Sequence, residues 1–229
     1  MCANRKQFSG FDRAESFLRD ITFEPRLKGA IYEQKTLETA QDILFETERL
    51  YLRRLSREDA PLLHELDSDP EVMRFISKGQ PTPLARIQNE YLPRMLGYYR
   101  ENPPQGFWAA HLRDSDEFIG WFHLRPDKMQ PREMELGYRL KRSVWGRGLA
   151  TEGSRGLLDR AFTEWQYETV CARTLAVNLA SRRVMEKIGL KFESEFLWGL
   201  DVLPGWTEEE RRGVKYNARA AGRAIGLGS

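Results

Sequence analysis

The stretch Trp145-Gly-Arg-Gly-Leu-Ala150 and the residues on either side of it decide the fold of this chain. Before it, residues 134–140 (MELGYRL) alternate apolar residues with others, and this period of two predicts a β-strand. After it, residues 151–165 have the pattern of an amphipathic helix. The first turn of a helix has unpaired N–H groups and a partial positive charge, and glycines let an anion approach the backbone. The order strand, basic glycine loop, helix therefore favours a pyrophosphate site, although a plain strand-to-helix turn has the same local pattern.

A second informative segment follows a predicted strand at residues 169–177. Residues 178–190 (NLASRRVMEKIGL) predict a short helix, with Asn178 as its N-cap, Ser181 in its first turn and Gly189 at its end. The chain thus has two strand-to-helix units, one after the other.

These two segments together resemble the GNAT acetyltransferase superfamily. Its acyl-CoA loop has the pattern Q/R-x-x-G-x-G/A, and its later segment runs from an asparagine through a serine to a glycine. The W-G-x-G form, with Thr151-Glu152 after it, is most similar to the RimJ/RimL type of protein N-acetyltransferase. The resemblance covers residues 45–220. It implies an α/β (α+β) fold with a mixed, mostly antiparallel, splayed central sheet flanked by helices, and acetyl-CoA as the cosubstrate.

The resemblance and the loop pattern together predict the acetyl-CoA contacts. They fall on the glycine loop, on the end of the strand before it and on the later segment. The predicted residues are Tyr138, Arg139, Leu140, Trp145, Gly146, Arg147, Gly148, Leu149, Ala150, Thr151, Asn178 and Ser181. The basic residues between Arg139 and Arg147 favour contact with CoA phosphates, the alternative being a solvated basic loop.

Acetyl transfer to an amine needs a held donor, a deprotonated amine, a polarised carbonyl and a proton for the leaving thiolate. In the family that this chain resembles, the amine attacks directly within a ternary complex. No enzyme nucleophile is then required, and Cys171 is predicted to be a small core residue. Glu135 is the candidate general base, because strand alternation places it on the face opposite Leu136 and Tyr138. A plain surface carboxylate is the alternative, and Glu133 is the nearest rival as base.

Two residues are candidates for the proton donor to the thiolate. Ser181 matches the serine of the family's later segment, and its alternative is a first-turn helix serine behind the Asn178 cap. The two roles are compatible, because a cap leaves the serine hydroxyl free. Tyr216, on the last predicted strand, matches a tyrosine often found near the family's C-terminal end and ranks second.

The composition is that of one soluble domain of ordinary size. The 229 residues are 41% hydrophobic and 31% charged, which suffices for a substantial core. A formal charge of +2 gives no indication of nucleic-acid or membrane-surface binding. Cys2 and Cys171 give no disulfide or zinc pattern, and no apolar run has the length of a membrane span or signal peptide. We therefore expect a cytoplasmic protein with no nucleic-acid or membrane partner.

The predicted domain boundaries leave two end segments outside the acetyltransferase domain of residues 45–220. Residues 1–44 have apolar residues at helical spacing and predict an N-terminal helical extension. Its simplest role is packing on the outside of the domain, and the alternatives are a cover over the acceptor site or a homodimer contact. Residues 221–229 are a C-terminal tail.

The rest of the domain has clear helix and strand signals. Strands are predicted at residues 49–53, 107–112, 117–124, 133–140, 191–200 and 211–218, with residues 107–124 forming a hairpin. Ser56 and Asp59 form a capping signal for a first helix. A second helix, from Leu84 up to Asn102, contains Pro93, which predicts a break or kink. Tyr91, Tyr98 and Tyr99 on this helix are candidate acceptor contacts or core residues.

The histidines His64, His111 and His123 form no metal-ligand pattern with carboxylates. The hairpin can place His111 opposite His123, but hydrogen-bonded sheet histidines are favoured over metal ligands. We therefore expect no metal.

These patterns favour an N-acetyltransferase that acts on a primary amine, either a protein N-terminus or a small-molecule amine. The alternative is a non-catalytic acyl-CoA-binding or regulatory module. Acceptor specificity is not encoded in a shared motif. Near the last hairpin, Trp198, Trp206 and Asp201 could form an aromatic and acidic wall for an ammonium group.

Overall fold

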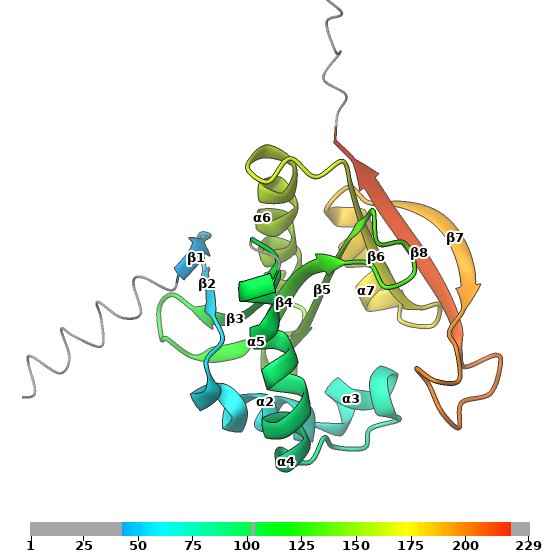
Figure 1. Cartoon of the computed structure of the whole chain (residues 1–229), viewed down its shortest axis with the longest axis horizontal. Helices are drawn as coiled ribbons and strands as arrows, with labels where there is room; N and C mark the ends of the chain where they lie inside the picture. The colour runs from blue at the N-terminus through cyan, green and yellow to red at the C-terminus, as the bar shows by residue number, and fades with distance from the viewer. Residues whose placement is uncertain (1–42, 102–103, 221–229) are drawn as a thin grey trace, which may run out of the picture. The chain divides into compact units, whose positions relative to one another are not determined.

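The structure is a computed structural model that describes residues 43–101 and 104–220 (Figure 1). The predicted C-terminal tail lies outside these residues, and so does the predicted N-terminal extension except for its last two positions. Within the described residues, no helix is both long enough and apolar enough to cross a membrane.

One mixed sheet of eight strands forms the centre of the described domain. Its order is β1-β2-β3-β4-β5-β6-β8-β7, and only the β5–β6 pair is parallel. This confirms the predicted mixed, mostly antiparallel sheet. The strands are β1 (Ile43–Glu46), β2 (Leu50–Arg54), β3 (Gly106–Leu112), β4 (Phe118–Pro126), β5 (Met134–Leu140), β6 (Thr169–Leu175), β7 (Lys191–Leu197) and β8 (Arg212–Arg219).

The sheet splays open at its parallel pair. β5 and β6 pair only at Met134 with Val170 and at Glu135 with Cys171. β5 continues to Leu140, so its backbone beyond Glu135 has no strand partner on the β6 side. Glu135 is therefore the last residue of β5 that pairs with β6 before the opening.

Helices cover both faces of the sheet, each over its own apolar cluster (Figure 1). On one face, α6 (Leu149–Thr163) and α7 (Leu179–Lys187) pack on a cluster that includes Leu136, Leu157 and Met185. On the other face, a cluster around Phe107 and Trp121 is covered by the segment between β2 and β3. That segment contains η1 (Arg57–Asp59), α2 (Ala60–Ser68), α3 (Pro70–Ser77), α4 (Leu84–Arg86), the π-helical η2 (Ile87–Tyr91) and α5 (Leu92–Glu101).

Pro93 does not break the second predicted helix. The helical run continues from α4 into α5 through the π turn of η2, which lies directly before Pro93. Proline has no N–H to donate to the turn before it, and the irregular turn falls at that place. Tyr99 also has a packing role, since its hydroxyl contacts the Leu55 N–H at 2.8 Å and the Phe107 carbonyl.

The register of the β3–β4 hairpin corrects the expected pairing of two histidines. His123 pairs with Phe107, and His111 pairs with Phe118, so the two histidines do not face each other. A bulge between Ala110 and His111 shifts the register within the hairpin, and alternation of hydrophobic residues does not predict where a bulge falls.

Candidate active site

The glycine loop leads from the end of β5 into α6. A short helix, η3 (Arg142–Val144), comes first, and Gly148 is the N-cap of α6. Gly146 and Gly148 have φ of 75° and 80°, the left-handed region that favours glycine. In the described part of the chain, no hydrogen bond uses the backbone N–H groups of residues 146–151. This run of unpaired donors at a helix N-terminus suits an anion.

Trp145 is held against the strand that precedes the loop. Its indole Nε1 donates to the Leu140 carbonyl at 2.9 Å, while the residue as a whole is 46% exposed. The loop entrance therefore has a fixed indole with an accessible face.

Most of the basic residues near the loop pair with carboxylates of α2 and its C-terminal end. Arg139 pairs with Asp67 and lies over the Trp121 ring, 5.1 Å from its centroid. Further along, Lys141 Nζ is 2.7 Å from Glu65 Oε1, and Arg142 Nε is 3.5 Å from Asp69 Oδ2. Among the described residues, Arg147 forms no ion pair, so it is the basic side chain of this cluster that remains for a phosphate.

A pocket of about 350 Å³ lies beside these ion pairs, between α2, α3 and the loop after β5. It is lined by Glu65, Leu66, Asp69, Val72, Lys141, Arg142 and Ser143. Neither Glu135 nor Ser181 lines it, so it is not the reaction centre that the sequence predicts.

The segment after β6 has the predicted cap. The Asn178 side chain accepts a hydrogen bond from the Ser181 N–H at 3.2 Å and donates to Thr174 Oγ1 at 3.1 Å. The Ser181 side chain lies near the hydroxyl of Tyr138 on β5. Burial raises the pKa of Tyr138, and the nearby Ser181 side chain offsets only part of that effect. Tyr138 and Ser181 thus join β5 to α7 across the opening of the sheet.

Glu135 is a mostly buried carboxylate and not a freely exposed surface residue. Its side chain is 12% exposed, and its Oε2 lies 2.5 Å from Arg125 Nη2 on the paired strand β4. Burial raises the pKa of Glu135, and although Arg125 acts to lower it, the net direction is upward. A carboxylate with a raised pKa at the mouth of the opening suits proton abstraction near neutral pH.

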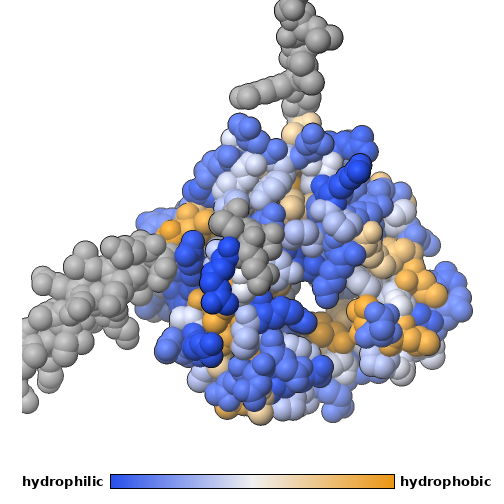
Figure 2. Space-filling view, viewed as in Figure 1, coloured by the Kyte–Doolittle hydropathy of each residue, from blue (hydrophilic) through white to orange (hydrophobic). Residues whose placement is uncertain are grey.

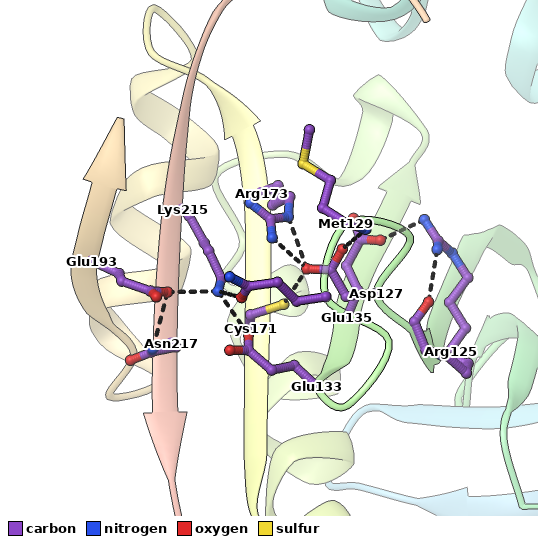
Figure 3. A network of polar contacts seen from close by, with 12 residues as sticks. Arg125, Asp127, Met129, Glu133, Glu135, Cys171, Arg173, Glu193, Lys215 and Asn217 are labelled. Carbon is purple, nitrogen blue, oxygen red and sulfur yellow. Dashed lines mark hydrogen bonds and ion pairs between the residues drawn. The ribbon is translucent and has the colours of Figure 1, made fainter. Parts of the chain in front are cut away.

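The rival base Glu133 pairs with a lysine in the network of polar contacts that Figure 3 shows. Buried Lys215 Nζ lies 2.8 Å from a carboxylate oxygen of Glu133 and 2.8 Å from one of Glu193. Because both carboxylates are paired with the same ammonium, we infer a structural role for Glu133.

Next to this pair, Asp127 holds two residues of β6 (Figure 3). Its Oδ2 lies 2.6 Å from Arg173 Nη2 and accepts the Cys171 thiol at 3.1 Å. Burial raises the pKa of Cys171, and Asp127 raises it further, so the thiol is a poor nucleophile. Asp127, Glu133 and Cys171 could place ligand atoms within 4.8 Å of one another, but Arg173 and Lys215 supply positive charge there.

Tyr216 lies on the other face of the sheet from Glu135. It pairs with Ala172, whereas Glu135 pairs with Cys171, and neighbouring strand positions face opposite sides. The Tyr216 hydroxyl donates to Glu186 Oε1 at 3.1 Å and contacts Arg182 Nε at 3.2 Å, both on α7. The structure thus brings Tyr216 beneath the same helix as Ser181 but gives its hydroxyl two partners already.

His123 is not the hydrogen-bonded sheet histidine that the sequence predicts. Within the described residues neither of its ring nitrogens has a hydrogen-bond partner, although the residue is buried. Its ring lies against Phe107 and Trp121, and it covers Gly137, where an added Cβ would lie 2.7 Å from the ring. Burial lowers the pKa of His123 well below its ordinary value, so the imidazole is neutral.

We expect His123→Phe to raise the free energy of unfolding by about 1 kcal/mol, because an unpaired buried polar group costs about 1–3 kcal/mol. Urea unfolding measures the change. His64→Phe is the matched control, since His64 Nδ1 contacts the Thr82 carbonyl at 3.0 Å and its loss should destabilise the fold. A His123→Phe protein less stable than the wild type would show that the imidazole has a partner.

The acceptor-wall candidates lie in and beside the loop between β7 and β8. The ring of Trp206 already has an ammonium over it, that of Lys78, 5.1 Å from the ring centroid. Asp201 is exposed. Burial lowers the pKa of Lys128, while the negative charges of Glu135 and Asp201 both act to raise it. Figure 2 shows hydrophobic atoms beside a hollow on the side of the molecule where this loop lies. Leu200 and Val202 of the loop are exposed.

Sequence reasoning missed several residues that shape the site. Arg125 holds the candidate base, and Arg49 contacts the glycine loop. Arg125 lies on β4 and Arg49 in the turn just before β2, and an arginine on or beside a strand is too common a signal to single either out. Glu152, which the sequence singles out only as part of the Thr151-Glu152 motif, is the ion-pair partner of Arg49.

Comparison with known protein families gives one match over most of the described domain. The family described as "Acetyltransferase (GNAT) domain" matches residues 49–191. Among curated proteins, the "FsC-acetyl coenzyme A-N(2)-transacetylase" of Aspergillus fumigatus is 32% identical over 187 residues, covering 78% of this chain and 74% of that protein. The "Uncharacterized N-acetyltransferase p20" of Bacillus licheniformis is 26% identical, covering 64% of this chain and 82% of that protein.

Solved structures share the fold at low sequence identity. The ribosomal L7/L12 alpha-N-protein acetyltransferase RimL, in complex with coenzyme A, has a TM-score of 0.63 at 14% identity, covering 78% of this chain and 98% of that one. The ribosomal-protein-S5-alanine acetyltransferase from Vibrio fischeri has a TM-score of 0.62 at 14% identity, covering 77% and 96%.

Proposed function

The chain belongs to the GNAT acetyltransferase family and is an acetyl-CoA-dependent N-acetyltransferase of the RimJ/RimL type, and we propose that it acetylates a primary amine by direct attack in a ternary complex. The observation that carries this proposal is the position of Glu135. Its side chain is mostly buried, its pKa is raised, and it is the last residue of β5 that pairs with β6 before the sheet opens. We place the catalytic domain at residues 45–220, as the sequence predicts.

The glycine loop is the proposed pyrophosphate site. The unpaired N–H groups of residues 146–151, including those of Leu149, Ala150 and Thr151, would hold the anion, with Arg147 adding charge. Trp145 would border the site. The Arg139 side chain forms an ion pair with Asp67. Arg139 would therefore contact the cosubstrate through its backbone, as Tyr138 and Leu140 would. Asn178 would act indirectly, by fixing the start of α7.

The proposed proton transfers use the two sides of the opening. Glu135 takes a proton from the acceptor amine, and Ser181 supplies one to the leaving thiolate. Ser181 is favoured over Tyr216, because the Tyr216 hydroxyl already contacts Glu186 and Arg182. Since Tyr138 lies near Ser181, it would orient the serine hydroxyl.

For the acceptor, we favour a small-molecule amine over a protein N-terminus. The 32% identical relative is named an N(2)-transacetylase, and its name mentions no protein substrate, whereas the two ribosomal-protein enzymes are only 14% identical. Acetyl-CoA turnover over a panel of small amines and peptides, read as free thiol released, tests this choice. Turnover with peptides alone would reverse it, and CoA binding without turnover would favour a non-catalytic acyl-CoA-binding or regulatory module.

We expect Asp201→Asn to raise the acceptor Michaelis constant several-fold with unchanged CoA affinity. The carboxylate would attract the ammonium form of the acceptor, and loss of one exposed charge pair is worth about 0.2–1 kcal/mol. Steady-state kinetics with the acceptor from the panel measure the effect. Glu208→Gln, at another exposed acid of the same loop, is the control. Unchanged acceptor kinetics in Asp201→Asn would remove this residue from the site.

A further inference from the structure

One glutamate and one arginine join the glycine loop to the turn between β1 and β2. Glu152 lies in the first turn of α6, and its Oε2 is 2.7 Å from Arg49 Nε and 2.5 Å from Arg49 Nη2. Its Oε1 accepts the Arg49 backbone N–H at 2.9 Å and the Thr47 hydroxyl at 2.6 Å. Both carboxylate oxygens of Glu152 are therefore occupied by one turn of chain 103 residues away in the sequence.

Arg49 also reaches the loop itself. Its Nη1 donates to the carbonyl oxygen of Arg147 at 2.9 Å. In a trans peptide the C=O and N–H groups point in opposite directions, so this contact turns the N–H of Gly148 away from Arg49. In the same way, the Glu152 N–H donates to the Gly148 carbonyl at 3.0 Å, which directs the N–H of Leu149. Two consecutive donors of the loop are thus oriented by Arg49 and the residue it binds.

The charges explain why an arginine is needed at this place. A lone carboxylate in the first turn of α6 would repel a pyrophosphate bound at the same helix end. Burial alone would raise the pKa of Glu152, but the hydrogen bonds from Thr47 and Arg49 lower it below its ordinary value. Glu152 is therefore ionised at neutral pH, and the guanidinium of Arg49 neutralises it.

We propose that Arg49, held by Glu152, is a positioning residue for the cosubstrate, because it aims the N–H groups of the glycine loop at the pyrophosphate and cancels the charge behind them. This inference rests on the proposed function of the loop. It adds the β1–β2 turn, which lies far from the loop in sequence, to the parts of the chain that determine acetyl-CoA affinity.

Arg49→Met tests the proposal. We expect CoA affinity, measured by calorimetric titration, to fall about tenfold or more, which corresponds to about 1.4 kcal/mol. We also expect the Michaelis constant for acetyl-CoA to rise by the same factor, with kcat and the acceptor Michaelis constant within about twofold of the wild type. Arg49→Lys keeps the charge but loses the planar fork, and its loss of affinity should be smaller.

Arg113→Met is the matched control. Arg113 is 46% exposed, close to the 45% of Arg49, and it binds the same turn through the Thr47 carbonyl at 2.9 Å and Glu46 at 3.2 Å. It forms no contact with the glycine loop among the described residues. Its removal should lower the melting temperature as Arg49→Met does and leave CoA affinity unchanged.

The outcomes separate the inference from the function on which it rests. Wild-type affinity in a folded Arg49→Met or Arg49→Lys protein would overturn the positioning role, as would an equal loss of affinity in Arg113→Met. If the wild-type protein itself does not bind CoA, the proposed function fails, and this inference fails with it. Should Arg49→Met not fold, the Arg49→Lys comparison decides.

Discussion

Glu135→Gln is expected to lower kcat by about 10²- to 10⁴-fold, the usual contribution of a positioned general base. Glutamine keeps the shape of the side chain but cannot accept the amine proton. CoA affinity should be unchanged, because the glycine loop lies at the other end of β5. Single-turnover kinetics with saturating acetyl-CoA measure the effect, and a CoA titration confirms that the cosubstrate site is intact.

Glu133→Gln is the matched control for this variant. Glu133 lies just before β5 and Glu135 near its start, but Glu133 pairs with Lys215, whereas Glu135 pairs with Arg125. We expect Glu133→Gln to lose stability and keep kcat. The assignment of the base would be wrong if Glu133→Gln lost activity while Glu135→Gln kept it.

Glu135 also sets the expected pH dependence of the activity. A base must be ionised to act, and the pKa of Glu135 is raised by burial. Activity should therefore fall as the pH drops through this raised value, above the ordinary glutamate pKa of about 4.3. The residual activity of Glu135→Gln should lack this acidic limb.

Gly148→Val is expected to weaken CoA binding by at least two orders of magnitude. A branched side chain at the N-cap of α6 would stand between the loop N–H groups and the pyrophosphate. Each charge-assisted hydrogen bond lost costs about 1.5–3 kcal/mol, and about 1.4 kcal/mol is tenfold in affinity. Loss of two such bonds gives the expected effect, which calorimetric titration with CoA measures.

The structure adds a second consequence of this substitution. Gly148 has φ of 80°, and a valine in that conformation is strained by about 1–3 kcal/mol. Space is not the problem, since the nearest atom to an added Cβ is Arg49 Nη2 at 3.6 Å. Gly205→Val separates strain from binding, because Gly205 has φ of 75° and nothing within 4 Å of an added Cβ. A folded Gly148→Val protein with wild-type CoA affinity, checked by circular dichroism, would contradict the phosphate-loop assignment.

Local pattern was sufficient to predict most elements of the described domain. Residues 134–140 and 169–175 are strands because they alternate or concentrate apolar residues, and the segment between them is a glycine loop followed by a helix. The Asn178 cap and the Ser56–Asp59 capping box also follow from neighbours in sequence. These interactions span only a few residues, so the sequence alone contains the information.

One helix of the domain, α3, is missing from the elements predicted from the sequence. Helix α3 begins at Asp69-Pro70, where the Asp69 side chain accepts the Glu71 N–H at 2.9 Å and Pro70 occupies the first turn. An N-cap aspartate before a first-turn proline is a recognised helix-start signal. The capping signal of Asp69-Pro70 is therefore sufficient to predict this helix from the sequence.

What the sequence by itself determined is the family-like order of strand, glycine loop and helix, and with it the candidate base and the anion site. Only the tertiary structure decided which charges meet. Arg139 pairs with Asp67, 72 residues away, Arg49 pairs with Glu152, and His123 is left without a hydrogen-bond partner among the described residues. Such contacts depend on strand order, register and helix packing, which arise from many weak apolar contacts at once. Hydrophobic period specifies which face a residue occupies, but not which distant residue it will face.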